Sequence, residues 1–277
     1  MKKILLLLLV FIFSACGEKD ELNVMTFNIR YASPNDGINI WDNRKEMCVD
    51  VFKEKNVDIA GLQEVLKHQL DYLTENLPDY EVYGIGRDDG KEAGEHMPVL
   101  YRKDRFELLE KNTFWLSETP NKPGNLCWNT VCNRVCSWVK LKDKHSNEII
   151  YFFNTHFSHV SDEARRKSAD MLLKEIAKIA GGSKVILTGD FNLTMDSVAY
   201  QKLVKNPAMK MVDASTNNTF TENDHTFNGW GKGDFKPIID YIFTSQNMSA
   251  IEYEIFTKKM SGVYISDHYP VISKLKI

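Results

Sequence analysis

The chain has 277 residues, of which 43% are hydrophobic and 26% are charged, so it can bury a sizeable core and does not have the composition of a disordered protein. Its formal net charge is -3. A protein that grips a long nucleic-acid duplex usually carries a basic excess, so this charge argues against a large duplex footprint, although not against a few phosphate contacts in one pocket.

The N-terminal residues differ in composition from the rest of the chain. Two lysines precede an apolar run over residues 4–13, which is too short to span a bilayer and is typical of a signal peptide. The run ends in FSAC, which resembles the cleavage box of bacterial lipoproteins, so we expect residues 1–16 to be a signal peptide whose lipobox ends at a lipidated Cys16. Residues 17–21 would be a short tether and residues 22–277 a single domain. The expected location is the bacterial outer membrane, on its periplasmic side or at the cell surface; an ordinary secretory signal is the alternative.

Beyond this leader, short apolar runs alternate with amphipathic stretches, which predicts an α/β protein. The predicted strands cover residues 22–30, 57–62, 80–83, 98–101, 106–115, 134–141, 149–154, 185–187, 238–243 and 271–277. Helices are predicted from Asn43 to about residue 55, over 66–77, from Ser161 to 180 and over 198–204, with Asn43 and Ser161 as N-caps. Residues 84–94 form a Gly-rich loop that could be a lid, a substrate wall or a solvated connection, and residues 216–234 form a long polar loop.

The apolar strand at residues 185–187 is followed closely by Asp190 and Asn192 in the sequence GDFN. In an extended segment these two side chains leave on the same side, while Phe191 points the other way. Open α/β sheets bind ligands beyond the carboxyl ends of their strands, so this pair is a candidate site. A simple turn built from Gly, Asp and Asn is the alternative.

Other polar side chains stand in similar places. Those that stand at the end of a predicted strand, follow one or stand just before the last one are Asn28, Glu64, His156, Asp267 and His268. Asp240 differs, because it is predicted to lie in the middle of the apolar strand 238–243. A carboxylate buried there needs a partner or a cation, and His268 is the natural candidate because a carboxylate can orient an imidazole and hold its positive charge.

Four cysteines follow Cys16, and three of them have the spacing C-x4-C-x3-C. This spacing lacks the C-x2-C knuckle of zinc modules, so one disulfide or none is favoured over a zinc site, with the pairing left open.

Several further side chains are weaker candidates for substrate binding. These are Arg134, His159, His225 and Trp230. Arg134 could reach a phosphate or pair at the surface, and His159 could support the site or be a solvated residue at a helix start. The remaining histidines, His68, His96 and His145, are expected at the surface.

Six motifs now stand in one order along the chain: TFNIR, LQEV, NTHFSH, GDFN, IDYIF and SDHYPV. Together they resemble the endonuclease/exonuclease/phosphatase superfamily, and the chain is similar in particular to exported lipoprotein members from Bacteroidetes. The resemblance implies an α/β (α+β) fold, a four-layer sandwich of two packed mixed β-sheets flanked by helices. It also implies an enzyme that hydrolyses phosphoric esters with the help of Mg²⁺ or Mn²⁺. An oxygen ligand such as Glu64 suits these ions better than it suits zinc.

The resemblance also implies roles for the residues at the strand ends. Glu64 would be the principal metal ligand, with Asp267 and Asn28 nearby. Asp190 would orient or deprotonate the attacking water, and Asn192 would hold the phosphate or the water.

Two histidines would complete this site. The pair of Asp240 and His268 would stabilise phosphoryl charge or serve as base, and His156 would donate to a phosphoryl oxygen or the leaving group. Whether Asp190 or His268 is the base stays open.

The expected substrate is a phosphodiester in nucleic acid, a nucleotide or a phospholipid headgroup, cleaved by a monomeric enzyme that the lipid on Cys16 tethers to a membrane. One alternative is a phosphomonoesterase of the inositol-phosphate type. Another is a lipoprotein that binds a phosphorylated ligand without cleaving it, although every chemical position is filled.

Overall fold

The structure of the protein is a computed structural model that describes residues 20–277. The expected signal peptide, the lipobox at Cys16 and residues 17–19 of the expected tether lie outside the described residues, and Glu21 already belongs to the first strand. Within the described part of the chain, no helix is both long and apolar enough to cross a membrane.

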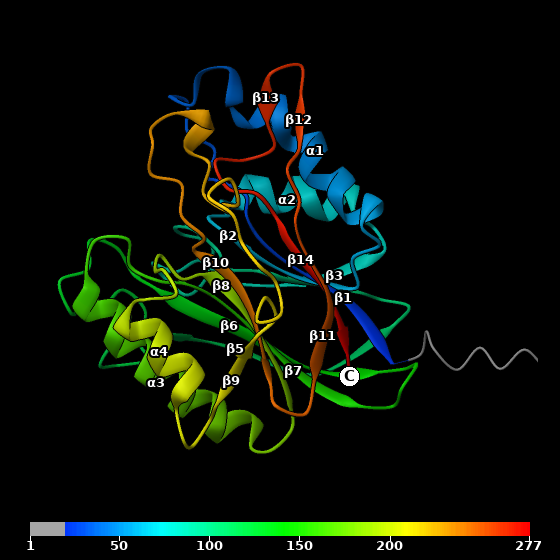
Figure 1. Cartoon of the computed structure of the whole chain (residues 1–277), viewed down its shortest axis with the longest axis vertical. Coiled ribbons are helices and arrows are strands. Elements are labelled where there is room, and N and C mark those ends of the chain that lie inside the picture. Colours follow the sequence, from blue (N-terminus) through cyan, green and yellow to red (C-terminus); the bar gives the residue numbers. More distant parts are fainter. Residues whose placement is uncertain (1–19) are drawn as a thin grey trace, which may run out of the picture.

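The first sheet has six strands in the order β11-β14-β1-β2-β4-β3 (Figure 1). Their bounds are β1 Glu21–Asn28, β2 Ile59–Gln63, β3 Tyr80–Tyr83, β4 Val99–Arg102, β11 Ser249–Ile255 and β14 Val271–Lys276. Strands β1 and β2 are parallel, and the other neighbours in this sheet are antiparallel. The helices α1 (Trp41–Glu54) and α2 (Lys67–Asn76) belong to this half of the chain.

The second sheet also has six strands, in the order β5-β6-β7-β8-β10-β9. Their bounds are β5 Phe106–Trp115, β6 Val135–Asp143, β7 Ile149–His156, β8 Lys184–Asp190, β9 Met211–Asp213 and β10 Asp240–Ser245. Strands β7 and β8 are parallel and are joined by α3 (Asp162–Ala180), while α4 (Val198–Lys205) packs beside α3. The remaining elements are η1 (Gly37–Asn39), η2 (Gly229–Gly231) and the short hairpin of β12 (Lys259–Met260) and β13 (Val263–Tyr264).

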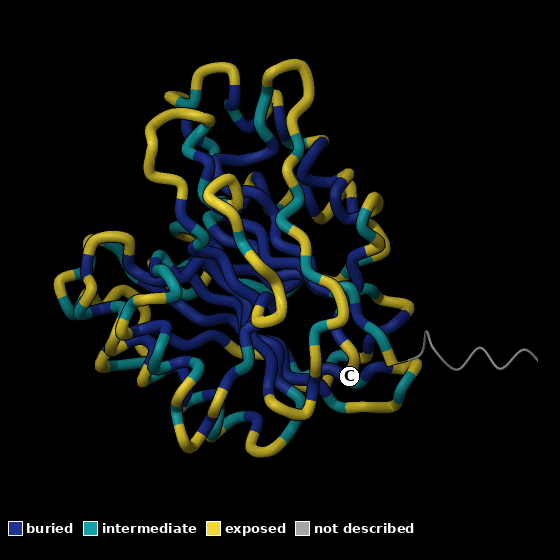
Figure 2. The backbone as a smooth tube through the Cα atoms, viewed as in Figure 1, coloured by how far each residue is buried: buried dark blue, intermediate teal, exposed yellow. Residues whose placement is uncertain are grey.

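The core divides into layers, which strand β8 illustrates. Ile186 packs in the cluster that joins the two sheets, whereas Val185 and Leu187 point to the opposite face and pack in the cluster that includes α3. A strand covered on both faces reads as a continuous apolar run, as residues 185–187 do. A third cluster joins the first sheet to α1 and α2, so the order is helices, sheet, sheet, helices, with the buried strands inside (Figure 2). The prediction of a four-layer sandwich is therefore confirmed.

A buried polar seam ties the two sheets together just below the ends of β2, β7 and β8. Gln63 donates from Nε2 to Oδ1 of Asn154 over 2.7 Å, and Asn154 donates from Nδ2 to the carbonyl of Leu62 over 2.7 Å. The two sheets approach so closely here that a Cβ atom on Gly61 would lie 2.2 Å from Oγ1 of Thr188. The seam fixes the register between the strands that carry Glu64, His156 and Asp190.

Three details differ from the sequence-based expectations. Helix α1 starts at Trp41 after Ile40, and Asn43 lies in its first turn, where Nδ2 donates to the carbonyl of Ile38 instead of capping the helix. Asp240 opens β10 instead of lying in its middle. Strands β9, β11, β12 and β13 were not predicted, because the first and the last two are very short and β11 is a largely exposed edge strand. The cap by Ser161 is confirmed, since its Oγ accepts from the backbone N–H of Ala164.

Candidate active site

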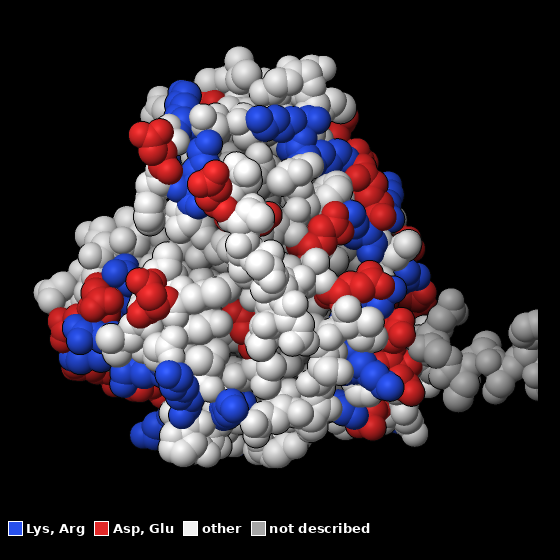
Figure 3. All heavy atoms as spheres, viewed as in Figure 1, with Lys and Arg blue, Asp and Glu red and all other residues white. Residues whose placement is uncertain are grey.

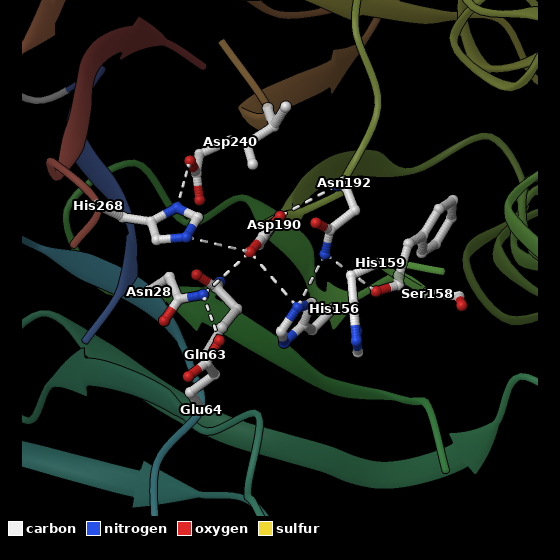
Figure 4. A network of polar contacts seen from close by, with 12 residues as sticks. Asn28, Gln63, Glu64, His156, Ser158, His159, Asp190, Asn192, Asp240 and His268 are labelled. Atoms are coloured by element: carbon white, nitrogen blue, oxygen red, sulfur yellow. Dashed lines mark hydrogen bonds and ion pairs between the residues drawn. The ribbon is translucent and has the colours of Figure 1, made fainter. Parts of the chain in front are cut away.

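The polar residues predicted at strand ends meet at one edge of the sandwich (Figure 4). Asn28 ends β1 and Glu64 follows β2, while His156 ends β7 and Asp190 ends β8. Both strand pairs are parallel, so their carboxyl ends lie together. Asp240 is the register partner of Asp190 on the antiparallel strand β10, and it thus faces the same edge.

Asp190 lies at the centre of the contacts. Its Oδ2 accepts a hydrogen bond from Nδ2 of Asn28 over 2.9 Å and lies 3.4 Å from Nε2 of His156 and 3.7 Å from Nε2 of His268. Its Oδ1 accepts from the backbone N–H of Asn192 over 3.0 Å. Burial, followed by the charge of Asp240, raises the pKa of Asp190 to about 7. This carboxyl can therefore take up or release a proton near neutral pH.

The predicted pairing of Asp240 with His268 is present in the structure. Nδ1 of His268 lies 2.8 Å from Oδ2 of Asp240. Burial alone would lower the pKa of His268, but the carboxylates of Asp240 and Asp190 raise it to about 10. His268 is therefore a buried imidazolium, held in place by one carboxylate and facing a second.

His156 has the opposite electrostatic character. Burial, together with the positive charge of Arg134, lowers the pKa of His156 well below its usual value. Its Nε2 lies 3.0 Å from Nδ2 of Asn192, which also donates to the carbonyl of Phe157. The site therefore contains one neutral and one charged histidine on either side of Asp190, so the two can perform different tasks.

The predicted metal ligands Glu64 and Asp267 both face the guanidinium of Arg30. Oε2 of Glu64 lies 3.7 Å from Nη1 of Arg30, and Oδ2 of Asp267 lies 3.7 Å from its Nε. Burial favours the neutral carboxyl of Glu64, but hydrogen bonding by Asn28 and the charge of Arg30 hold its pKa below the usual value. The carboxylate oxygens of these residues are the donor type that Mg²⁺ and Mn²⁺ prefer, so the chemistry of Glu64 fits a hard divalent cation. Among described residues, Asp267 belongs to neither of the groups whose ligand atoms lie within 4.8 Å of one another, so ligation by Asp267 stays a prediction.

Glu64 also offers an oxygen to a second grouping. Ligand atoms of Glu64, His156 and Asp190 lie within 4.8 Å of one another. Asn28 presents Nδ2 to the carboxylates of Glu64 and Asp190, while its Oδ1 accepts from the backbone N–H of Arg30. Ligation by Asn28 stays a prediction.

Three residues at this edge have a left-handed backbone. The φ angles are 58° at Arg30, 61° at Glu64 and 49° at Asn192. This region is unfavourable for residues with a Cβ and recurs at functional sites, where surrounding contacts maintain it. Here the carboxylate of Glu64 accepts from the backbone N–H of Tyr31, and the carboxylate of Asp190 accepts from that of Asn192, so the side chains of the site stabilise its own turns.

These residues line one side of a cavity of about 670 Å³. Arg134 and His159 line it as well, which places both sequence candidates at the site. His225 and Trp230 are not among the described residues that line it, since His225 packs on Tyr269 and Trp230 packs on Tyr264. The long loop reaches the cavity through Phe227 instead, and Phe235 and Pro237, which follow the loop, line the cavity too.

The cavity also contains residues that sequence reasoning missed: Arg30, Arg87, Glu95 and Arg165. Two of them had a usable signal, because Arg30 follows Asn28 by two residues and Arg165 lies in the first turn of the predicted helix after Ser161. Arg87 belongs to the Gly-rich loop, which is therefore a wall of the cavity and not a plain connection.

One histidine and the cysteines complete the comparison with expectation. His96 was predicted at the surface, which is wrong, because it is buried and binds the backbone of Val65, the residue after Glu64, through its own backbone and Nδ1. The four described cysteines are all free, in agreement with the alternative of no disulfide. Among described residues, no cysteine belongs to a group that could hold a metal ion.

Known proteins resemble this chain over nearly its whole length. Residues 25–268 match the sequence profile of the Endonuclease/Exonuclease/phosphatase family. An endonuclease/exonuclease/phosphatase from Bacteroides vulgatus is 40% identical and superposes with a TM-score of 0.88, over 93% of this chain and 99% of that one. A mannosyl-6-phosphatase from Bacteroides thetaiotaomicron is 32% identical, with a TM-score of 0.84, over 92% of this chain and 100% of that one. An uncharacterized protein of Acanthamoeba polyphaga mimivirus is 25% identical over 249 residues, which are 84% of this chain and 91% of that protein.

The family profile spans the metal-ligand candidates and the histidines of the site, and the similar structures include a phosphatase. The chain therefore belongs to the endonuclease/exonuclease/phosphatase family, whose members are divalent-metal-dependent phosphoester hydrolases.

Proposed function

We propose that this enzyme is a phosphomonoesterase that acts on a small polar molecule such as a phosphorylated sugar. The observation that carries the proposal is the cavity of about 670 Å³, which has the size of a small-molecule site and places Asp190, His156 and His268 beside several arginines. The 32% identity with a mannosyl-6-phosphatase, over the full length of that protein, supports a monoester.

A phosphodiester was the first expectation from the sequence, and nucleic acid was one of its sources. Recognition of a polymer by its phosphates would call for a basic track that leads away from the cavity. On the face in Figure 3, acidic and basic side chains are instead interspersed. The arginines in the cavity wall, by contrast, suit a compact and strongly anionic molecule.

In this proposal Glu64 and Asp267 hold the divalent cation, which is Mg²⁺ or Mn²⁺. The cation would neutralise charge on the phosphoryl oxygens as the ester is cleaved. Asp190, with its pKa of about 7, accepts a proton from the attacking water, and Asn192 positions that water or the phosphate. His268 contributes fixed positive charge beside the phosphoryl group, whereas neutral His156 donates a hydrogen bond to a phosphoryl oxygen or to the leaving group.

The proposal extends to location. The apolar run at residues 4–13 and the FSAC sequence support export and lipid anchoring at Cys16. Labelling of cells with a radioactive fatty acid should mark the wild-type protein and leave Cys16→Ser unlabelled. A labelled Cys16→Ser protein would contradict the anchor.

The test of function uses the chain from Gly17 onwards. We expect glucose 6-phosphate and mannose 6-phosphate to be hydrolysed with Mg²⁺ or Mn²⁺ and not with EDTA, faster than bis-p-nitrophenyl phosphate. Glu64→Ala should abolish metal-supported turnover and weaken Mn²⁺ binding measured by calorimetry, because it removes a carboxylate from the cation site. The exposed Glu75→Ala is the matched control and should change neither.

Two results would count against the proposal. Faster cleavage of the diester would return the enzyme to the phosphodiesterases. Full activity of Glu64→Ala would remove Glu64 from the metal site.

A further inference from the structure

We propose that Arg134, together with Arg87, Arg165 and His159, forms a second anion-binding subsite in the cavity, so that the substrate carries a second oxyanion besides the phosphate that is cleaved. The inference rests on the proposed phosphomonoesterase function and adds the class of substrate: a small molecule with a phosphate ester and a further phosphate or carboxylate.

The environment of Arg134 is the main observation. The residue is only 5% exposed, and its guanidinium makes a single hydrogen bond, between Nη2 and Nδ1 of His159 over 2.9 Å. Its Nε and Nη1 are buried without a hydrogen-bond partner, and no carboxylate among residues 20–277 forms an ion pair with it. A buried guanidinium in this state loses its hydration without compensation from the protein, so the missing acceptors have to come from the cavity, where an oxyanion can supply a pair of them. Because Arg134 lines the cavity, such a ligand can reach it.

The neighbouring side chains leave this wall with an excess of positive charge. Arg87 binds Glu95 through Nη1 over 2.6 Å, but its Nε is also buried without a partner. Arg165 donates to the carbonyl of Ser158 and lies 3.7 Å from Asp162.

The three arginines of this wall thus face two carboxylates, Glu95 and Asp162. Burial, followed by the charge of Arg134, lowers the pKa of His159; Glu64 acts in the opposite direction, and Arg87 and Arg165 add smaller lowering effects. All three guanidinium groups therefore act on the same region of the cavity.

The residues assigned to the phosphate that is cleaved come from other elements than this wall. Glu64, which follows β2, and Asp267, which precedes β14, would hold the cation, and His268 lies 3.7 Å from Asp190. Arg134 instead precedes the first residue of β6, Arg165 lies on α3 and Arg87 follows β3. A guanidinium fork matches the paired oxygens of a phosphate or a carboxylate, so this separate wall is suited to a second group of that geometry.

The experiment compares three sugars that share one phosphate ester: glucose 6-phosphate, glucose 1,6-bisphosphate and 6-phosphogluconate. We expect the wild-type enzyme to prefer at least one of the last two by tenfold or more in kcat/KM, mainly through a lower KM. A preference for the bisphosphate identifies a phosphate as the second group, and a preference for 6-phosphogluconate identifies a carboxylate.

Arg134→Met should reduce this preference to about onefold, and Arg134→Lys should retain part of it because the charge remains while the fork is lost. Arg166→Met is the matched control, because Arg166 lies on α3 outside the cavity and is 46% exposed in its side chain. It should keep the wild-type preference. A melting temperature for each variant, measured without ligand, shows that the protein is folded.

A binding measurement separates the two proposals. In an Asp190→Asn background, which slows turnover, calorimetry with glucose 1,6-bisphosphate and 6-phosphogluconate should show at least tenfold weaker binding of the preferred sugar after Arg134→Met. If no monoester is hydrolysed but this loss is seen, the proposed function fails and the subsite stands. The subsite is refuted if the wild type shows no preference, or if Arg134→Met weakens all three sugars equally, since Arg134 would then hold the phosphate that is cleaved.

Discussion

Two arginines that are equally buried stand at opposite ends of strand β6, and their surroundings differ. Arg105 is 5% exposed and contacts Asp143, the last residue of the strand, and Asp58, at distances of 3.2 and 2.9 Å. It also donates to the carbonyl of Glu21. Arg134, also 5% exposed, stands just before the first residue of β6 and has only His159 as a partner. The two side chains are therefore equally buried, but the guanidinium of Arg105 has partners for its charge and its donors, whereas that of Arg134 has a partner for one donor.

The difference teaches that burial of a charge does not by itself mark a functional site. At Arg105 the protein supplies both countercharges, so the cluster is complete and connects β5, β6 and the segment before β2. At Arg134 two donor nitrogens are buried without a partner, and the residue lines a cavity that also contains the catalytic candidates. Buried donors without a hydrogen-bond partner beside a cavity indicate a functional site more specifically, because nearly all buried polar groups in folded proteins have a partner.

The largest effect is expected on kcat, for the ion pair of Asp240 and His268 in the candidate active site. Asp240 binds His268 over 2.8 Å, and if pairing alone marked a structural role, Asp240 would behave like Asp143. We expect instead that Asp240→Asn lowers kcat by about 10³- to 10⁴-fold, because the imidazole loses its orienting carboxylate and the charge that stabilises its protonated form. Steady-state kinetics and denaturant unfolding would be measured together.

Asp143→Asn is the matched control, since it makes the same change of atoms in the Arg105 cluster. It should lower the free energy of unfolding and leave kcat within about twofold. A wild-type rate for Asp240→Asn would show that the Asp240–His268 pair is structural.

The next effect concerns stability and tests the two arginines directly. Arg105→Met should lower the free energy of unfolding by about 3–5 kcal/mol, because it leaves the buried carboxylates of Asp58 and Asp143 without their partner. Arg134→Met should leave it unchanged or raise it, since it removes an uncompensated charge. Urea unfolding without ligand measures both. An equal loss of unfolding free energy in the two variants would mean that Arg134 stabilises the fold as Arg105 does, and the contrast between the two arginines would be wrong.

The layers of this fold were predictable from particular residues. The run at residues 185–187 indicated a strand covered on both faces, and Ile186 and Leu187 do pack on opposite sides of the sheet. Strand β11 was not predictable in the same way, because most of its side chains are exposed and its position is set by pairing with β14. The hydrophobic pattern of a sequence reflects which residues are buried, so an edge strand with few buried side chains cannot be recognised from that pattern.

The site was predictable as far as it is built from strand ends. Asn28, His156 and Asp190 end their strands and Glu64 follows one, and the parallel pairing of these strands brings their ends together. Arg87 was not predictable, because it comes from a loop whose path depends on its pairing with residues near Glu95 and His96. For the same reason the sequence did not show that His225 and Trp230 turn to other neighbours while Phe227 reaches the cavity.

The smallest expected effect is on stability and concerns the pair of Arg87 and Glu95. Arg87 is intermediate between Arg105 and Arg134, because it has one carboxylate partner but its Nε is buried without a hydrogen bond. Burial raises the pKa of Glu95 to about 7, from 4.5 in the unfolded chain, although Arg87 acts in the opposite direction. Because the folded state binds this proton more tightly, its stabilising contribution is complete below about pH 4.5 and is lost as the pH rises through 7.

The free energy of unfolding of the metal-free protein should therefore fall less between pH 5 and 8 in Glu95→Gln than in the wild type, by at most about 3 kcal/mol. Parallel curves for the two proteins would show that Arg87 already compensates the buried carboxylate in full, as the aspartates compensate Arg105. In that case Arg134 would be the arginine of this wall that lacks a countercharge among the described residues. The second anion subsite would then consist of Arg134 and His159.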